Sequence, residues 1–127
     1  MRLSDDPLVL LRAPSICYLA TVMADGSPQL TQTWVDTDDE HVIINSVQSH
    51  LKVRNIQRDG RVAVALSDPA DPGHYVQVRG RVIEVITDGA ADHIEMLSRK
   101  YTGGDYANPI TSERVKVFVE PERQRVQ

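Results

Sequence analysis

The chain has few of the residues that cross-link extracellular proteins or stack on nucleic-acid bases. Its 127 residues include one cysteine, and only 5% are aromatic. A lone cysteine, Cys17, cannot form an internal disulfide, which favours a reducing compartment. Its neighbours Ile16 and Leu19 are apolar, so we expect a buried thiol that packs as a small hydrophobic group and does not react.

Long hydrophobic runs and an excess of positive charge are also missing. No apolar segment approaches the length of a membrane span, and the chain turns acidic at Asp5 and Asp6, which a signal peptide does not do. The net charge of −4 argues against general nucleic-acid binding. We therefore expect a cytoplasmic protein whose partners are neither membranes nor nucleic acids.

Hydrophobic residues make up 41% of the chain, which is enough for one core. No linker or repeat divides the sequence, so a single domain over residues 1–127 is expected. Helices are predicted at about 4–13, 49–58 and 88–101. Six strands are predicted at about 16–23, 29–36, 41–47, 61–66, 74–86 and 115–119. Short strands joined mainly by turns predict a mainly β fold, a closed antiparallel barrel with inserted helices.

Several turns are marked by glycine or by acidic residues. Asp25-Gly26 lies between two strand-like runs and predicts a hairpin. Gly60 follows the second helix and suits a left-handed helix end. A bend is predicted at Gly80 in the long fifth strand, and Asp88 is the predicted N-cap of the third helix.

The segment from Ser49 to Ile56 places positive charge where a helix does not favour it. Ser49 is a good N-cap, and a capping box would have Glu or Gln three residues later. This chain has Lys52 there, and His50 lies nearby. The helix N-terminus already carries about half a positive charge, so free amides and a lysine together predict a phosphate site. The alternative is a solvated lysine tolerated at small cost.

The predicted strand over residues 29–36 does not alternate like a core strand. Thr31 and Thr33 lie on one face, and Gln32 and Trp34 lie on the other. Threonines offer hydrogen bonds to a flat polar ligand, and Trp34 could form the wall of a pocket for a planar ring. The alternatives are an edge strand with a wet face and a tryptophan that serves ordinary packing.

Several short segments also occur in a recognisable order. They are Leu19-Ala20-Thr21, Asp25-Gly26-Ser27-Pro28, Trp34-Val35-Asp36, Lys52-Val53-Arg54-Asn55-Ile56, Arg61-Val62-Ala63-Val64, Val78-Arg79-Gly80-Arg81-Val82 and Arg99-Lys100-Tyr101. This pattern, from about residue 16 to residue 119, resembles the split-barrel flavin and deazaflavin oxidoreductases related to pyridoxamine 5′-phosphate oxidase. It looks most like the short branch that binds coenzyme F420. The resemblance implies a six-stranded split β-barrel, a homodimer, and a cofactor groove at the dimer interface.

The resemblance also implies roles for individual residues. Lys52 matches the lysine that binds the cofactor phosphate, and His50 falls where deazaflavin-binding relatives often carry arginine. Histidine is a weaker, pH-dependent phosphate ligand. Tyr75 matches a position that reaches the cofactor across the dimer. Asn55 matches a family asparagine on the same helix as Lys52, and Ser46 matches a hydroxyl position near the ring. The candidate cofactor-binding residues are therefore Thr31, Thr33, Trp34, Ser46, Ser49, His50, Lys52, Asn55 and Tyr75.

The sequence identifies no catalytic acid or base, no nucleophile and no metal-ligand spacing. His41, His74 and His93 are scattered, and we expect surface or packing roles for them. Reduced F420 delivers a hydride, so the protein's task would be to hold the ring against a planar, electron-poor small-molecule substrate. The expected function is an F420-dependent oxidoreductase. The alternatives are an FMN-binding oxidoreductase of the same fold and a non-enzymatic carrier of a cofactor or haem.

Overall fold

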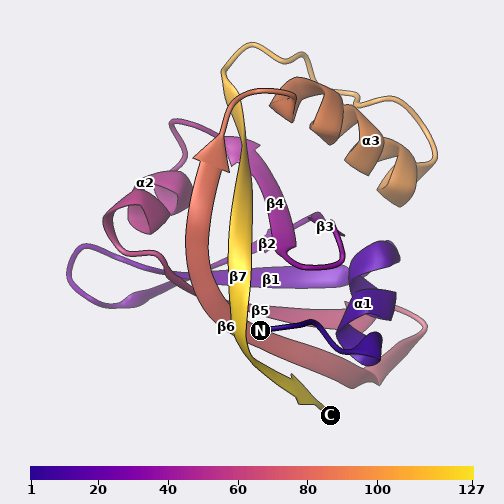
Figure 1. Cartoon of the computed structure of the whole chain (residues 1–127). Coiled ribbons are helices and arrows are strands. Elements are labelled where there is room, and N and C mark those ends of the chain that lie inside the picture. Colours follow the sequence, from indigo (N-terminus) through magenta and orange to yellow (C-terminus); the bar gives the residue numbers. More distant parts are fainter.

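The computed structural model describes residues 1–127 and shows one curled antiparallel sheet with three helices (Figure 1). The strands are β1 (Ile16–Val22), β2 (Pro28–Thr33), β3 (Val35–Thr37), β4 (Val42–Val47), β5 (Arg61–Asp68), β6 (Asp71–Ile86) and β7 (Arg114–Val126). The helices are α1 (Asp5–Arg12), α2 (Leu51–Arg58) and α3 (Ala90–Thr102). The mainly β, antiparallel fold with inserted helices is as predicted, but the predicted closed barrel is wrong, because β2 and β3 do not pair and the curled sheet stays open between them.

The number of strands is not as predicted, because the strand expected over residues 29–36 divides at Trp34. β2 ends at Thr33 and pairs with β1, whereas β3 begins at Val35 and pairs with β4. The sheet order is β2-β1-β5-β6-β7-β4-β3, so β2 and β3 form its two edges. One straight strand cannot pair with both neighbours at opposite edges. The chain therefore crosses from one edge to the other at Trp34, and the sheet has seven strands instead of six.

The last strand is longer than the sequence predicts. It continues past Val119 to Val126, and its polar end pairs with the first half of β6, as in the pair Gln77 and Arg125. Backbone hydrogen bonds hold this ladder and need no apolar side chains, so hydrophobic periodicity does not reveal it. Figure 1 shows β6 and β7 side by side along their length as both bend.

The bend in β6 lies at Gly80, as predicted. The register of β6 against β7 shifts between Arg79 and Gly80, and Gly80 pairs with Pro121. A Cβ atom at Gly80 would overlap the carbonyl oxygen of Glu120. Only glycine allows the two backbones to approach this closely, and the close approach lets both strands turn the corner.

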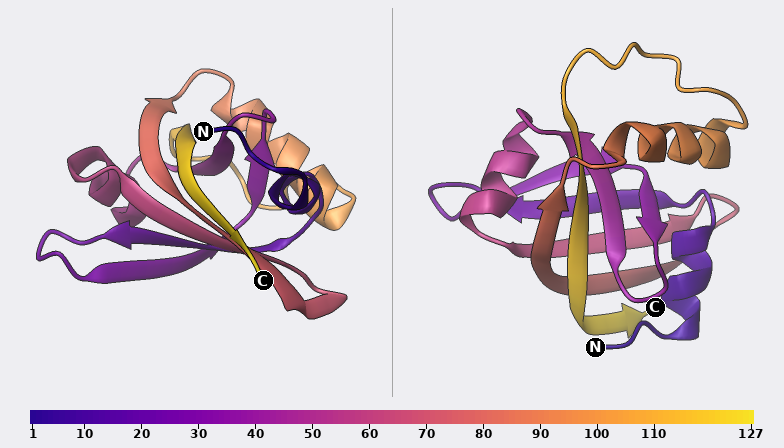
Figure 2. Two further views of the ribbon diagram at one scale, coloured as in Figure 1. Left: turned by 60° about the horizontal axis from the view of Figure 1, so that its bottom comes forward. Right: turned by 45° about the horizontal axis from the view of Figure 1, so that its top comes forward.

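The core lies inside the curl of the sheet and is closed by the helices. α1 packs against β3, β5 and β6, α2 packs against β1, and α3 packs against β4 and β7. Leu11, Cys17, Val53, Leu66 and Val76 are fully buried in one cluster. Figure 2 shows the segment between α3 and β7 arching beyond α3. None of the helices combines the length and the apolar character that a membrane span requires.

The start of α2 lies later than predicted. His50 is the N-cap instead of Ser49, and the first helical residue is Leu51. The reason is that the carbonyl oxygen of His50 accepts a hydrogen bond of 3.2 Å from the N–H of Arg54. Lys52 is therefore the second residue of the helix, not the third, and still lies in the first turn.

Two further turn predictions are wrong, and one is confirmed. The N-cap of α3 is Gly89 and not Asp88, because the chain enters this helix with a φ of 73°, which glycine adopts at little cost. Gly60 does not have a positive φ, since α2 ends through an extended Asp59. The hairpin at Gly26 joins β1 to β2 as predicted.

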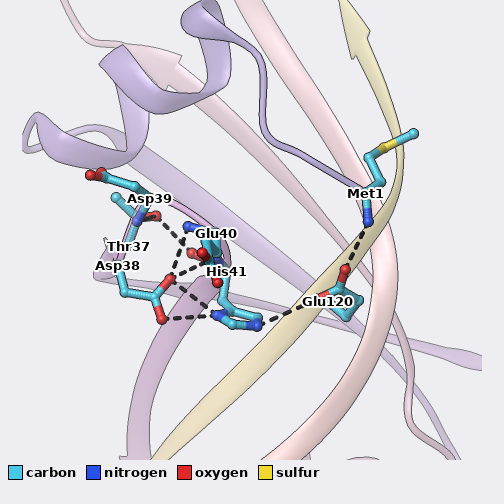
Figure 3. A network of polar contacts seen from close by, with 7 residues as sticks. All are labelled: Met1, Thr37, Asp38, Asp39, Glu40, His41 and Glu120. Carbon is cyan, nitrogen blue, oxygen red and sulfur yellow. Dashed lines mark hydrogen bonds and ion pairs between the residues drawn. The ribbon is translucent and has the colours of Figure 1, made fainter.

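A polar network joins the start of the chain to β7 and to the turn between β3 and β4 (Figure 3). The ring of His41 lies between the carboxylates of Asp38, at 2.8 Å, and Glu120, at 3.4 Å. The amino group of Met1 donates to Glu120 at 2.8 Å and lowers the pKa of that carboxyl. His41 thus has a surface and packing role, as predicted, and so does His74, whose ring bonds the terminal backbone.

Replacing Gly80 by alanine is expected to destabilise the protein by about 1–3 kcal/mol, the usual cost of overpacking. Urea unfolding measures the change. Gly73→Ala is the matched control, because nothing lies within 4 Å of its added Cβ and its φ is not positive. The control should be neutral or slightly stabilising. Equal unfolding midpoints for the two variants would contradict the close approach at Gly80.

Candidate functional site

A cavity of about 510 Å³ lies where β2 and β3 part at Trp34. Five parts of the chain contribute to it: the start of β1, the break between β2 and β3, the end of β4 with the start of α2, helix α3, and the segment that leads into β7. The lining residues are Pro14, Ser15, Ile16, Cys17, Gln32, Thr33, Trp34, Asn45, Ser46, His50, Lys52, Ile94, Tyr101, Tyr106, Asn108 and Arg114.

One end of the cavity gathers cationic side chains without a carboxylate. His50, Lys52 and Arg114 line it, and no Asp or Glu does. Burial lowers the pKa of the Lys52 ammonium, and the positive charge of Arg114 lowers it further. Like charges held together in a half-buried place are unfavourable unless an anion joins them. The electrostatics of this end therefore favour an anionic ligand.

The N-terminus of α2 adds backbone donors to the same end. His50 is the N-cap, and its side chain makes no capping hydrogen bond. The N–H groups of Leu51 and Lys52 have no acceptor one turn earlier in the helix, as at any helix start. The hydroxyl of Ser46 lies 3.4 Å from Nδ1 of His50 and orients the ring. The helix dipole, the amides and the side chains all favour negative charge here.

The other end of the cavity is aromatic. The ring of Trp34 stacks on that of Tyr101 with centroids 5.2 Å apart and planes at 9°. Tyr106 meets Trp34 edge-on at 6.2 Å and 77°. The guanidinium of Arg114 lies 5.6 Å from the centre of the Tyr106 ring, so the aromatic wall adjoins the cationic end. A ligand with a planar ring and an attached anion matches both ends.

Helix α3 holds the strand immediately after Trp34. The hydroxyl of Tyr101 accepts a hydrogen bond from the N–H of Val35 at 3.1 Å and donates to the carbonyl of Ser15 at 2.8 Å. Lys100 donates to the carbonyls of Val35 and Leu11, each at 2.6 Å. Burial raises the pKa of Tyr101 to about 12 and lowers that of Lys100. Both backbone groups of Val35 are thus fixed by α3.

Cys17 borders the cavity but is not a reactive group. It is fully buried, and burial raises the pKa of its thiol to about 12. A thiolate is therefore disfavoured at neutral pH, and the prediction of a buried, unreactive cysteine is confirmed.

The structure brings together five of the nine predicted site residues. They line one cavity from three different parts of the chain, and they are Thr33, Trp34, Ser46, His50 and Lys52. Thr31 precedes Thr33 on the same face of β2, and its buried hydroxyl has no hydrogen-bond partner in the chain. β2 is also an edge strand, as the alternative interpretation of this segment required.

The other three predicted residues lie elsewhere. Ser49 is exposed just before the cap of α2. Asn55 is fully buried, and its side-chain amide donates to Thr21 and Gln29 at 3.1 Å each. Tyr75 lies on β6 with 43% of its surface exposed. None of the three lines the cavity of this chain.

Sequence reasoning missed several residues that form the cavity. Arg114 begins the last strand, and Tyr106 lies in a glycine-rich stretch that no local pattern connects with Lys52. Asn45 alternates with core residues in β4 and carries no separate sign of function. Tyr101 belongs to the segment Arg99-Lys100-Tyr101, which was part of the family resemblance, and this resemblance was the only sign in the sequence that it serves the site.

The similarity to known proteins agrees with this geometry. Residues 8–124 match the family model described as pyridoxamine 5′-phosphate oxidase. The chain belongs to this family. A solved structure named F420 reductase is 30% identical in sequence, with a TM-score of 0.86 over 97% of this chain and 98% of that chain. No curated protein matches the sequence.

Two further solved structures have lower sequence identity, and their similarity shows only that the fold is shared. A conserved protein from Mycobacterium tuberculosis is 23% identical, with a TM-score of 0.77 over 98% of this chain and 85% of its own. HupZ from Group A Streptococcus is 20% identical, with a TM-score of 0.70 over 98% of both chains. The recognised family and its curled sheet are therefore confirmed, while the ligand is not identified by these similarities.

Tyr101→Phe is expected to destabilise the protein by about 1–3 kcal/mol, because the N–H of Val35 and the carbonyl of Ser15 lose a buried partner. Urea unfolding followed by the fluorescence of Trp34, the single tryptophan, measures both stability and the environment of the indole. Tyr18→Phe is the matched control, since it also removes one tyrosine hydroxyl but not one that holds Val35 and Ser15. Unchanged stability and emission in the Tyr101 variant would show that α3 does not hold the strand break.

Proposed function

We propose that the protein is an F420-dependent oxidoreductase that reduces a planar conjugated small molecule. The observation that carries this proposal is the cavity itself, which joins a cationic end without carboxylates to an aromatic wall. F420 has an anionic phosphate attached to a planar deazaflavin. The 30% identity to a structure named F420 reductase over almost the whole chain supports the same assignment.

The residues present fit such a cofactor. Lys52, His50 and Arg114, with the first amides of α2, would hold the phosphate. Trp34 and Thr33 would border the ring, and the unpartnered hydroxyl of Thr31 leaves a hydrogen-bonding group on the same face of β2. When bound, the reduced cofactor supplies a hydride. The chain's own task is to orient the two reactants and to keep water away from them.

This chemistry asks for no strong acid or base from the protein. The thiol of Cys17 and the phenol of Tyr101 both have a pKa raised to about 12, so both stay protonated at neutral pH. No carboxylate lines the cavity either. We therefore infer that binding and orientation, not proton transfer by a side chain, are the protein's main contributions.

FMN is the alternative cofactor, because it also joins a phosphate to a planar tricyclic ring. The same cationic end and aromatic wall would hold it, and the family is described by a flavin-dependent oxidase. Parallel calorimetric titrations with F420 and FMN distinguish the two. Tight binding of FMN with none of F420 would favour the alternative. Tight binding of F420 without hydride transfer to quinones or tetrapyrroles would favour a carrier.

We also propose a homodimer. The outer face of the sheet over β1, β2 and β5 carries small or apolar side chains, namely Tyr18, Ala20, Leu30, Ala63 and Ala65, and its one charged residue is Arg61 at the start of β5. Gln32 pairs with Tyr18 on this face and also lines the cavity, so the face adjoins the site. Tyr75 lies on the same side of β6, two residues before Gln77, which pairs with Ala65. A second copy packed here would reach the cavity.

The free thiol of Cys17 further supports a cytoplasmic location.

Lys52→Ala is expected to weaken F420 binding by about 1–3 kcal/mol, the scale of a lost charge-assisted hydrogen bond. Isothermal titration calorimetry measures the change, and circular dichroism checks the fold. Arg54→Ala is the matched control, because this neighbouring residue of α2 is exposed and does not line the cavity. An unchanged affinity in the Lys52 variant would mean that this lysine does not bind the phosphate.

The proposed dimer is expected to appear in light scattering at micromolar concentration, and Ala65→Arg should convert it to a monomer. A charge placed on the apolar face would be buried without a partner. Asp92→Arg is the control, since this exposed residue of α3 lies away from that face. A wild-type monomer, or a dimer that survives Ala65→Arg, would contradict the interface.

A further inference from the structure

A chain of hydrogen bonds leads from the cavity into the protein. Nε of Arg114, on β7, donates to Oδ1 of Asn45, on β4, at 2.6 Å. The amide nitrogen of Asn45 lies 3.0 Å from Nδ1 of His93, on α3. Nε2 of His93 lies 2.9 Å from a carboxylate oxygen of Asp36, on β3. Asn45 and His93 are 5% and 7% exposed, so the middle of the chain is buried.

The orientation of the Asn45 amide is fixed without reference to His93. Its nitrogen donates to the carbonyl oxygen of Ala90 at 2.8 Å, and its oxygen accepts from Arg114. Since the amide nitrogen can only donate, Nδ1 of His93 must be the acceptor of the second N–H. Nε2 of His93 then carries the proton and donates it to Asp36. Every bond in the chain is satisfied only while His93 is neutral.

We propose that Asn45 and His93 are positioning residues for Arg114, and that protonation of His93 releases the guanidinium from its place at the cationic end of the cavity. A protonated ring would present Nδ1–H to the amide N–H of Asn45, and two donors cannot bond. Turning the amide would satisfy His93 but would present the amide nitrogen to Arg114. The contact between Arg114 and Asn45 is then lost in either case.

Some charged groups around His93 favour protonation of its ring, and others oppose it. Asp36 from β3 favours the protonated ring, and the pKa of Asp36 shows that the two groups interact. Burial raises the pKa of Asp36, but the hydrogen bond from His93, the Thr37 amide and the charges of His93 and Lys100 outweigh burial and lower it. Arg114 from β7 and Lys100 from α3 itself oppose a charge on His93, and Lys116 of β7 reaches the start of α3 near Gly89.

The ligand affinity therefore has two opposite dependences on pH. This step rests on the proposed function, because it takes the anion to be the cofactor phosphate. Protonation of His50, which borders the anion, would strengthen binding as the pH falls. Protonation of His93 would weaken binding through Arg114. The experiment must separate the two histidines, and glutamine serves at both positions as a side chain that does not titrate.

The first test uses the ligand-free protein, so that it does not depend on the cofactor. Nitrogen-15 NMR of the imidazoles should show His93 as the Nε2–H tautomer at neutral pH. The Nε–H signal of Arg114 should move or broaden with the titration of His93, and it should stay fixed in His93→Gln. His74→Gln is the control and should leave the titration unchanged. The Nδ1–H tautomer, or an Arg114 signal that ignores His93, would overturn the proposal.

The second test measures F420 affinity by calorimetry from about pH 7.5 to about pH 5.5, the range in which histidine titrates. In His50→Gln the affinity should fall roughly tenfold, the scale of one weakened charge-assisted contact. In His50→Gln with His93→Gln it should stay flat. An equal fall in both variants would overturn the coupling. Absence of F420 binding at every pH would refute the proposed function instead, and the NMR result would still decide the positioning role.

Discussion

The hold of α3 on the strand after Trp34 is the constraint on which the cavity depends. The sheet has two edges, β2 and β3, and they are continuous only through this one residue. Lys100 and Tyr101 bond both backbone groups of Val35 and tie them to Leu11 near the end of α1 and to Ser15 just before β1. Buried backbone groups that lose such partners are costly. The edges are therefore held apart at a fixed spacing, and that spacing forms the aromatic end of the site.

At the cationic end the side chains are not paired in this way, because no group of opposite charge lies beside them. Burial and the charge of Arg114 lower the pKa of Lys52, and the first turn of α2 adds its dipole. Arg12, Arg61 and Arg99 each pair with a carboxylate on the surface, whereas no carboxylate lines the cavity beside Lys52 and Arg114. Partly buried like charges without a counter-ion are typical of a site that binds an anion.

The sequence predicts what depends on neighbours in the chain and misses what depends on distant partners. The hairpin at Gly26, the corner at Gly80 and the buried Cys17 follow from local patterns and are confirmed. The division of β2 from β3 does not, because it follows from pairing at opposite edges of the sheet. Arg114 reaches the site through Asn45, 69 positions earlier, and no sequence period connects them.

Asn55 shows how one residue of a recognised pattern can serve the site from a distance. Its amide bonds Thr21 of β1 and Gln29 beside the same hairpin, while its oxygen accepts from Arg58. The bonds to Thr21 and Gln29 join α2 to β1 and β2, and β2 leads directly to Trp34. Lys52 lies three residues earlier on that helix, so the position of the cationic end relative to Trp34 is set by where Asn55 is held. A side chain that does not line the cavity thereby fixes the helix that carries one of the cavity's cations.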